Sequence, residues 1–227
     1  MKNIIISTAV ISMMIITVPR EAGTATLSYS IGDVKVQRTS VRETGRPGMT
    51  INTGDTVITG ERSLAIISFS RGSMVKMRQN TRLKVTGEIE AGRESPALFL
   101  QSGSVFSKIL KRAPGESYRI QTKTIVASVR GTEFFFSFGK GENSSRDLWL
   151  CVNSGKVLVS DLAGNEAPVT VAEGQGILIS KGTGITPPRE YPWTKNLNWN
   201  MDPDRGSVID DTDLNSAYTD LLNQDYD

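Results

Sequence analysis

Hydrophobic and polar residues alternate with a period of two over most of the middle of this chain. In Tyr118–Thr122, Tyr118 and Ile120 fall on one face, whereas Leu64–Phe69 is apolar on both faces. Similar short runs recur from about residue 31 to residue 180, and Gly, Asn and Ser separate them. Because this alternation fits a pleated strand, the pattern predicts an all-β domain of about a dozen short strands. Such chains close into sandwiches, barrels or β-solenoids.

Glycines are expected at the turns between these strands. Gly32, Gly103 and Gly155 are each followed two residues later by valine, and this recurring pattern predicts hairpin turns. The clearest case is the hairpin predicted around Gly155, between Leu148–Val152 and Lys156–Val159. The glycine spacing keeps no strict period, so a regular repeat array is not predicted.

The stretch VASVRGTEFFFSF, residues 126–138, reads as a strand, a sharp turn and a second strand. Gly131 allows a backbone conformation that a Cβ atom would forbid. Arg130 carries a planar fork of N–H donors that can bind turn carbonyls or a carboxylate, such as Glu133 or Asp55. We interpret this turn mainly as a structural corner, and the alternative is that Arg130 contacts a ligand or partner.

The phenylalanines after this turn also alternate. Phe134, Phe136 and Phe138 share one face, which we expect in the core, and Phe135 points to the opposite face. Phe135 belongs to ordinary core if both faces of its sheet are covered, and it is an exposed apolar position if they are not. We favour the covered sheet.

The first 25 residues have the pattern of a secretory signal peptide. Lys2 precedes an apolar run, Ile4–Val18, that is short for a membrane span, and small residues follow it. Cleavage is expected after Ala22 or Ala25, with a slight preference for Ala25. The alternative is an uncleaved anchor, which would be the chain's one contact with a membrane. The segment predicts a periplasmic or secreted bacterial protein.

Residues 182–227 differ in composition from the β domain predicted over residues 31–181. Residues 200–227 contain eight Asp and one Arg, a net charge of −7, which leaves +9 for the rest of the chain out of a total of +2. This extended acidic tail contains a short helical candidate, Asp213–Leu222. Its Asp-x-Asp spacing is typical of calcium loops, but the EF-hand pattern is incomplete, so a solvated tail without metal is favoured.

Three aromatic residues lie in the Pro- and Asn-rich segment before the acidic tail. Tyr191, Trp193 and Trp199 could stack on sugars or clamp a partner. The alternative, which we favour, is that they hold the tail onto its own domain. They are candidate contact residues, together with Arg130.

Missing residue types exclude several kinds of chemistry. The chain has no His, which removes Ser-His-Asp and Cys-His catalysis, and the single Cys151 forms no internal disulfide. Cys151 lies in an apolar run, where a buried side chain is expected. The basic residues of the body are scattered, so nucleic-acid binding is not predicted. We therefore expect no enzyme, no cofactor and no metal site.

The order of motifs resembles a known family. The motifs are Gly54–Gly60, Arg71-Gly72-Ser73, VASVRGTEF and Glu173–Gly176, together with the Gly-x-Val pattern. This set resembles the FecR domain, the periplasmic part of bacterial iron-transport regulators, which is also found alone in many envelope proteins. The resemblance covers residues 31–181. It implies a solenoid-like β-sandwich outside the cytoplasmic membrane that acts in protein–protein signalling or envelope binding.

The function expected from this resemblance is non-catalytic. The leading hypothesis is a stand-alone module that senses or binds another envelope protein, because the regulators place a sigma-factor-binding region and a membrane helix before this domain. Here roughly 30 residues that look like a signal peptide precede it. One alternative is a structural protein that binds peptidoglycan or another glycan. The other is a regulator of iron-transport signalling.

Overall fold

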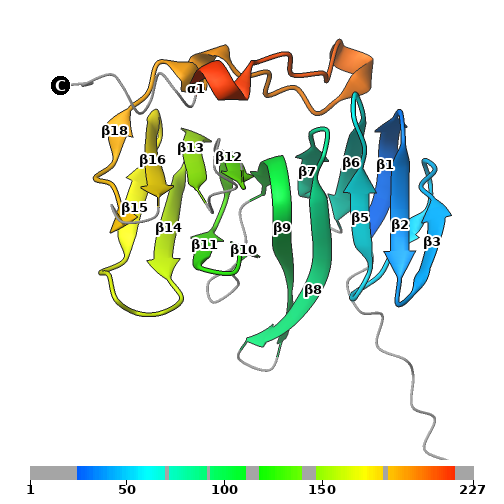
Figure 1. Ribbon diagram of the computed structural model, residues 1–227, viewed down its shortest axis with the longest axis horizontal. Helices are drawn as coiled ribbons and strands as arrows, with labels where there is room; N and C mark the ends of the chain where they lie inside the picture. The colour runs from blue at the N-terminus through cyan, green and yellow to red at the C-terminus, as the bar shows by residue number, and fades with distance from the viewer. Residues whose placement is uncertain are drawn as a thin grey trace, which may run out of the picture.

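The computed structural model describes residues 25–69, 72–90, 93–110, 118–139, 147–180 and 184–217. These residues form eighteen strands, β1 to β18, in place of the dozen predicted, and only short helical pieces. The prediction of a mostly β protein is confirmed. The strands form two sheets, which we call sheet A and sheet B (Figure 1).

Sheet A has the strand order β4 (Thr50–Ile51), β1 (Ala25–Ile31), β6 (Leu64–Phe69), β7 (Met74–Met77), β9 (Arg93–Ile109), β12 (Thr132–Phe138), β13 (Leu148–Ser154) and β16 (Gln175–Ser180), with β17 (Gly184–Ile185) and β18 (Arg189–Glu190) both paired to β16. Sheet B has the strand order β3 (Val41–Thr44), β2 (Val34–Arg38), β5 (Thr56–Thr59), β8 (Arg82–Glu90), β9, β10 (Tyr118–Gln121), β11 (Ile125–Val129), β14 (Lys156–Asp161) and β15 (Val169–Ala172). One strand, β9, therefore runs through both sheets.

The core lies between the two sheets. Alternate residues of each sheet, among them Val36 and Val157 of sheet B and Ile67 and Phe134 of sheet A, belong to one buried apolar cluster. Phe69 of sheet A meets the ring of Tyr118 of sheet B edge to face, with centroids 6.1 Å apart. The apolar residues of the period-two alternation thus form the inner face of each sheet. Their burial stabilises the fold.

The hairpins predicted at the Gly-x-Val pattern are wrong. Gly32, Gly103 and Gly155 all have positive φ, as the pattern requires, at 74°, 93° and 85°. However, the strand before each glycine pairs in one sheet and the strand after it pairs in the other. At Gly103 the change of sheet occurs within β9. The glycines therefore form corners between sheets, because local backbone freedom specifies a bend and does not choose the pairing partner.

The corner at Gly131 joins β11 of sheet B to β12 of sheet A and is stacked on the corner at Gly155. A Cβ atom at Gly155 would lie 2.7 Å from the carbonyl oxygen of Gly131. The buried hydroxyl of Thr132 donates to the carbonyl of Lys156 at 2.9 Å. The predicted turn at Arg130-Gly131 is confirmed.

The first strand begins earlier than predicted. Strand β1 starts at Ala25, inside the range expected for the signal peptide, and Gly32, with a φ of 74°, separates it from the next strand, β2. The alternation of Ala25 and Leu27 is too short to identify β1 without its pairing partner β6. The remainder of residues 1–25 lies outside the described residues.

At the other end of the chain, residues 214–217 form one helical turn, and the rest of the predicted helix, like the acidic tail beyond residue 217, lies outside the described residues. Asp213 accepts a hydrogen bond from the amide of Asn215 at 3.0 Å. In the described part of the chain, no helix combines the length and apolar character needed to cross a membrane.

Candidate functional site

A single row of side chains crosses the outer face of sheet A, the face turned away from sheet B. Each member pairs in register with the next across six adjacent strands. From β6 to β16 the row reads Ile66, Lys76, Phe106, Phe135, Cys151 and Gly176. The five side chains of this row are fully or almost fully buried, so something covers this face.

The cover is the C-terminal segment, by which we mean residues 191–217. Figure 1 shows it in orange and red, running from β18 across the strands toward β6 and back toward α1 (Trp193–Asn196). Its apolar residues form one cluster with the outer face of sheet A, and Val208 packs in a second cluster with Leu64 and Ile66. In the first cluster the segment contributes Tyr191, Leu197, Met201, Leu214 and Ala217, with Trp193 and Trp199 packed against it.

Tyr191 is the first residue of the C-terminal segment to contact the outer face of sheet A. Its ring lies over Gly176, the member of the row that belongs to β16. A Cβ atom at Gly176 would collide with the Tyr191 ring and would lie 2.8 Å from the carbonyl oxygen of Leu150. Gly176 therefore leaves the space that the ring occupies. Burial raises the pKa of the Tyr191 hydroxyl, and Thr186 opposes this by a hydrogen bond.

Aromatic rings continue the contact along the row. Phe106 lies 4.8 Å from Phe135, and Phe135 lies 5.1 Å from Trp149, measured between ring centroids. Trp199 of the segment meets Phe106 edge to face at 5.2 Å, and its indole N–H donates to the carbonyl of Thr194 at 2.8 Å. The prediction that Phe135 is core on a sheet covered on both faces is confirmed. Cys151 is fully buried beside these rings, which raises the pKa of its thiol to about 12.

Lys76 is the polar member of the row. Its side chain is 0% exposed, and its ammonium group lies 4.3 Å from the centroid of the Phe106 ring. It donates to the carbonyl oxygens of Asn198 at 2.6 Å and Asn200 at 2.8 Å, two main-chain groups of the C-terminal segment. Burial lowers the pKa of Lys76 to about 8, and the nearby charge of Asp210 opposes this shift.

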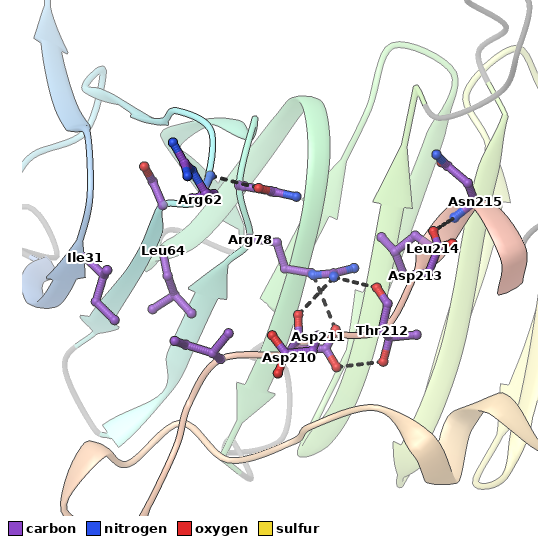
Figure 2. Close-up of a pocket in the computed structure, with 13 residues that line it drawn as sticks. Ile31, Arg62, Leu64, Arg78, Asp210, Asp211, Thr212, Asp213, Leu214 and Asn215 are labelled. Atoms are coloured by element: carbon purple, nitrogen blue, oxygen red, sulfur yellow. Dashed lines mark hydrogen bonds and ion pairs between the residues drawn. The ribbon is translucent and has the colours of Figure 1, made fainter.

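Arg78 binds the returning part of the segment (Figure 2). Its guanidinium donates to the carbonyls of Asp210 at 3.0 Å and Thr212 at 2.8 Å. It also forms an ion pair with the Asp210 carboxylate at 3.3 Å, in which the two side chains are 11% and 2% exposed. The second carboxylate oxygen of Asp210 accepts from the amide of Asn198 at 2.9 Å. The pair therefore ties together both passes of the segment and the sheet.

The C-terminal segment also holds its own shape. The side-chain amide of Asn198 donates to the carbonyls of Ser207 at 2.9 Å and Ile209 at 2.8 Å. That of Asn200 donates to the carbonyl of Asp202 at 3.0 Å, just before the short helix η2 (Pro203–Arg205). These bonds join the outgoing and returning passes, so the segment lies on the sheet as an ordered loop.

Two aspartates of the acidic stretch, Asp202 and Asp210, bind other groups of the protein. Asp202 accepts from the amide of Asp204 and pairs with Arg205 at 3.1 Å, and Asp210 pairs with Arg78. A pocket of about 420 Å³ lies beside the Arg78–Asp210 pair (Figure 2). Arg62 and Leu64 line it on one side and residues 209–215 on the other.

The structure brings three of the four predicted site residues together. Tyr191, Trp193 and Trp199 all pack against the outer face of sheet A, whereas Arg130 is exposed at the corner between β11 and β12. The carboxylates suggested as partners of Arg130 have other contacts, since Asp55 binds Arg38 at 3.1 Å and Glu133 binds Asn153 at 2.7 Å.

Sequence reasoning did not identify the contacts that Lys76, Arg78 and Asp210 make. The local sequence predicts a solvent-exposed side chain for a lysine at an outward position of a short strand. It predicts the same for an aspartate in an acidic tail. Their contacts join residues more than 120 positions apart, so no local pattern could reveal them.

Residues 55–158 match the family model described as FecR protein. This part of the chain is similar to the FecR family. This confirms the resemblance found in the motifs. The match includes β5 to β13, and therefore Lys76, Arg78 and most of the row, whereas the C-terminal segment lies outside it.

Two crystal structures, each described as a "putative anti-sigma factor" from Parabacteroides distasonis, are similar to this chain. One has a TM-score of 0.53 at 16% identity and covers 73% of this chain and 72% of that one. The other has a TM-score of 0.49 at 14% identity and covers 60% of this chain, which spans 59% of that protein's length. No curated protein matches this chain significantly. At these identities, the first likeness shows a shared fold.

Proposed function

We propose that this chain is an exported FecR-domain protein that works by binding another protein of the bacterial cell envelope, without catalysis. One observation carries the proposal: the FecR domain holds an extended peptide segment on one face of sheet A, through Lys76 and Arg78. A surface that binds main-chain carbonyls and a carboxylate is suited to recognising polypeptide. The signal-like N-terminus and the FecR resemblance support the location.

The glycan-binding alternative has less support. Sugar stacking needs an open aromatic face, yet Tyr191 is buried over Gly176 and Trp199 is packed on Phe106. A role in sigma-factor signalling is a narrower form of the same proposal, since it too requires contact with a protein partner.

Cross-linking in intact cells tests the proposed function. A tagged full-length chain is expected to capture a defined envelope protein, identified by mass spectrometry. The matched control lacks residues 2–22 and is expected to stay inside the cell and lose that partner. If the exported chain captures no protein beyond the control, the proposal is wrong.

The mature N-terminus tests the export step. We propose that cleavage follows Ala22, because Ala25 is fully buried and pairs with Ile51 and Phe69 at the start of β1. Cleavage after Ala25 would remove the first residue of that strand. Mass spectrometry of the protein recovered from cells should find Gly23 as the first residue, and an intact N-terminus would indicate an anchor.

A further inference from the structure

The contacts between sheet A and the C-terminal segment resemble those of a receptor with a peptide ligand. The segment lies across the strands and does not extend the sheet, so its backbone is bound by side chains. If the segment only had to shield apolar surface, an apolar residue at position 76 would serve, because burying an ammonium group costs free energy unless it is fully hydrogen-bonded. Apolar packing alone would stabilise this contact. Lys76 and Arg78 in addition make it specific for a segment that presents carbonyls and a carboxylate at the right positions.

We infer that the outer face of sheet A is a binding surface for an acidic, extended segment of a partner protein, and that the C-terminal segment occupies this surface until the partner displaces it. The inference rests on the proposed function and specifies where and how the partner binds.

The contacts define the chemistry of the partner. Lys76 requires two carbonyls two residues apart, as in Asn198 and Asn200, and Arg78 requires a carboxylate, as in Asp210. The ring of Phe106 is matched by an aromatic ring packed edge to face, as in Trp199. The resident segment has five Asp against one Lys and one Arg. Since the two cations of the surface would repel a basic chain, an acidic segment with an aromatic residue is selected.

The attachment of the segment is compatible with displacement. It follows β18, a two-residue strand, and contains only a four-residue helix, a three-residue helix and one further helical turn. Its hydrogen bonds are largely internal or come from two side chains of the sheet. Segments with such sparse anchoring open at a lower free energy than core strands. Covalent attachment gives it an effective concentration of about millimolar, so a partner at lower concentration must bind correspondingly more tightly to displace it.

A labelled peptide in trans tests the inference. The probe is a fluorescent synthetic peptide of residues 191–217, and the host is the full mature chain, with or without Trp199→Ala and Asp210→Asn to weaken its own segment. Fluorescence anisotropy is expected to show at least tenfold tighter binding to the weakened host than to the unsubstituted one. The matched control is a peptide carrying the same two substitutions, which should bind at least tenfold more weakly.

Two outcomes would overturn the inference. One is equal binding, or none, to both hosts while circular dichroism shows intact β structure. The other is loss of the β spectrum in the weakened host, which would make the segment an essential part of the fold. A host with Arg78→Met should lose the peptide even when its own segment is weakened. If the peptide-binding experiments give a negative result while cross-linking still captures an envelope protein, the proposed function stands and the partner binds elsewhere.

Discussion

The two faces of sheet A are both buried, but they are buried in different ways. The inner face packs on sheet B through a large apolar cluster that includes Phe134, Phe136 and Val105. The outer face is covered by a single looped segment, and its row of side chains includes a fully buried lysine. Neighbouring residues of one strand, Phe134 and Phe135, therefore belong to two different environments.

This difference separates what holds the fold from what the fold can bind. Packing between two hydrogen-bonded sheets is cooperative, so the inner face opens only when the domain unfolds. The cover of the outer face can open while both sheets persist, because side chains such as Lys76 and Arg78 hold its described part to the sheet. Polar groups with defined partners occur on the face that can open, as expected for recognition.

The largest effect should distinguish the two faces directly. Phe134→Ala is expected to lower the free energy of unfolding by about 3–5 kcal/mol, because it leaves a cavity between two rigid sheets. Phe135→Ala should cost less, about 2 kcal/mol, because the C-terminal segment can settle into the space. Urea unfolding followed by circular dichroism measures both, and equal losses would mean that the outer cover is as rigid as the core.

Lys76→Met should loosen the cover without harming the sheets. The carbonyls of Asn198 and Asn200 would lose a charged donor, worth about 2 kcal/mol, so hydrogen exchange at the amides of residues 198–202 should accelerate at least tenfold. Global stability should change by less than about 1 kcal/mol, since an apolar side chain replaces a buried charge. Met77→Leu, its inward-facing neighbour, is the control and should leave these amides protected. Unchanged exchange in Lys76→Met would show that Lys76 does not hold the segment.

The buried lysine also predicts a pH dependence. Its pKa is about 8 in the folded protein against 10.5 ordinarily, so above pH 8 the folded chain releases a proton that the unfolded chain keeps. Stability should therefore rise from pH 7 to pH 9, by about 1 kcal/mol. The rise should stop near pH 9, where the unfolded chain begins to ionise Cys151, whose pKa burial raises from 9.0 to about 12. The urea midpoint measures this, and Lys76→Met should abolish the rise. A midpoint that falls between pH 7 and pH 9 would contradict the prediction.

The smallest effects are expected where the two sheets meet, at the corner after β11. Thr132→Val removes a buried hydrogen bond to the carbonyl of Lys156 and should cost about 1 kcal/mol. Arg130→Ala changes an exposed side chain and should alter stability by no more than about 0.5 kcal/mol. Thermal melting compares the two variants. A loss of the cross-linked partner in Arg130→Ala, at unchanged stability, would identify Arg130 as a partner contact.

The amino-acid sequence by itself determined the class of the fold and the family. Period-two alternation predicts strands because side chains of a pleated backbone point to alternate faces, and this holds wherever the strand pairs. The stretch VASVRGTEFFFSF correctly indicated a turn at Gly131 and an inward row of phenylalanines. The positive φ of Gly32, Gly103 and Gly155 also follows from local backbone freedom, so the sequence predicted bends at these positions.

Only the tertiary structure decided what those bends connect and what covers the outer face. A glycine turn can lead to a hairpin or to a change of sheet with the same backbone angles, and distant strands settle the choice. Lys76 is buried because a segment more than 120 residues later lies over it, and nothing near Lys76 in the chain encodes that contact. Burial and pairing are properties of the assembled sheets, whereas alternation and backbone freedom are properties of the chain.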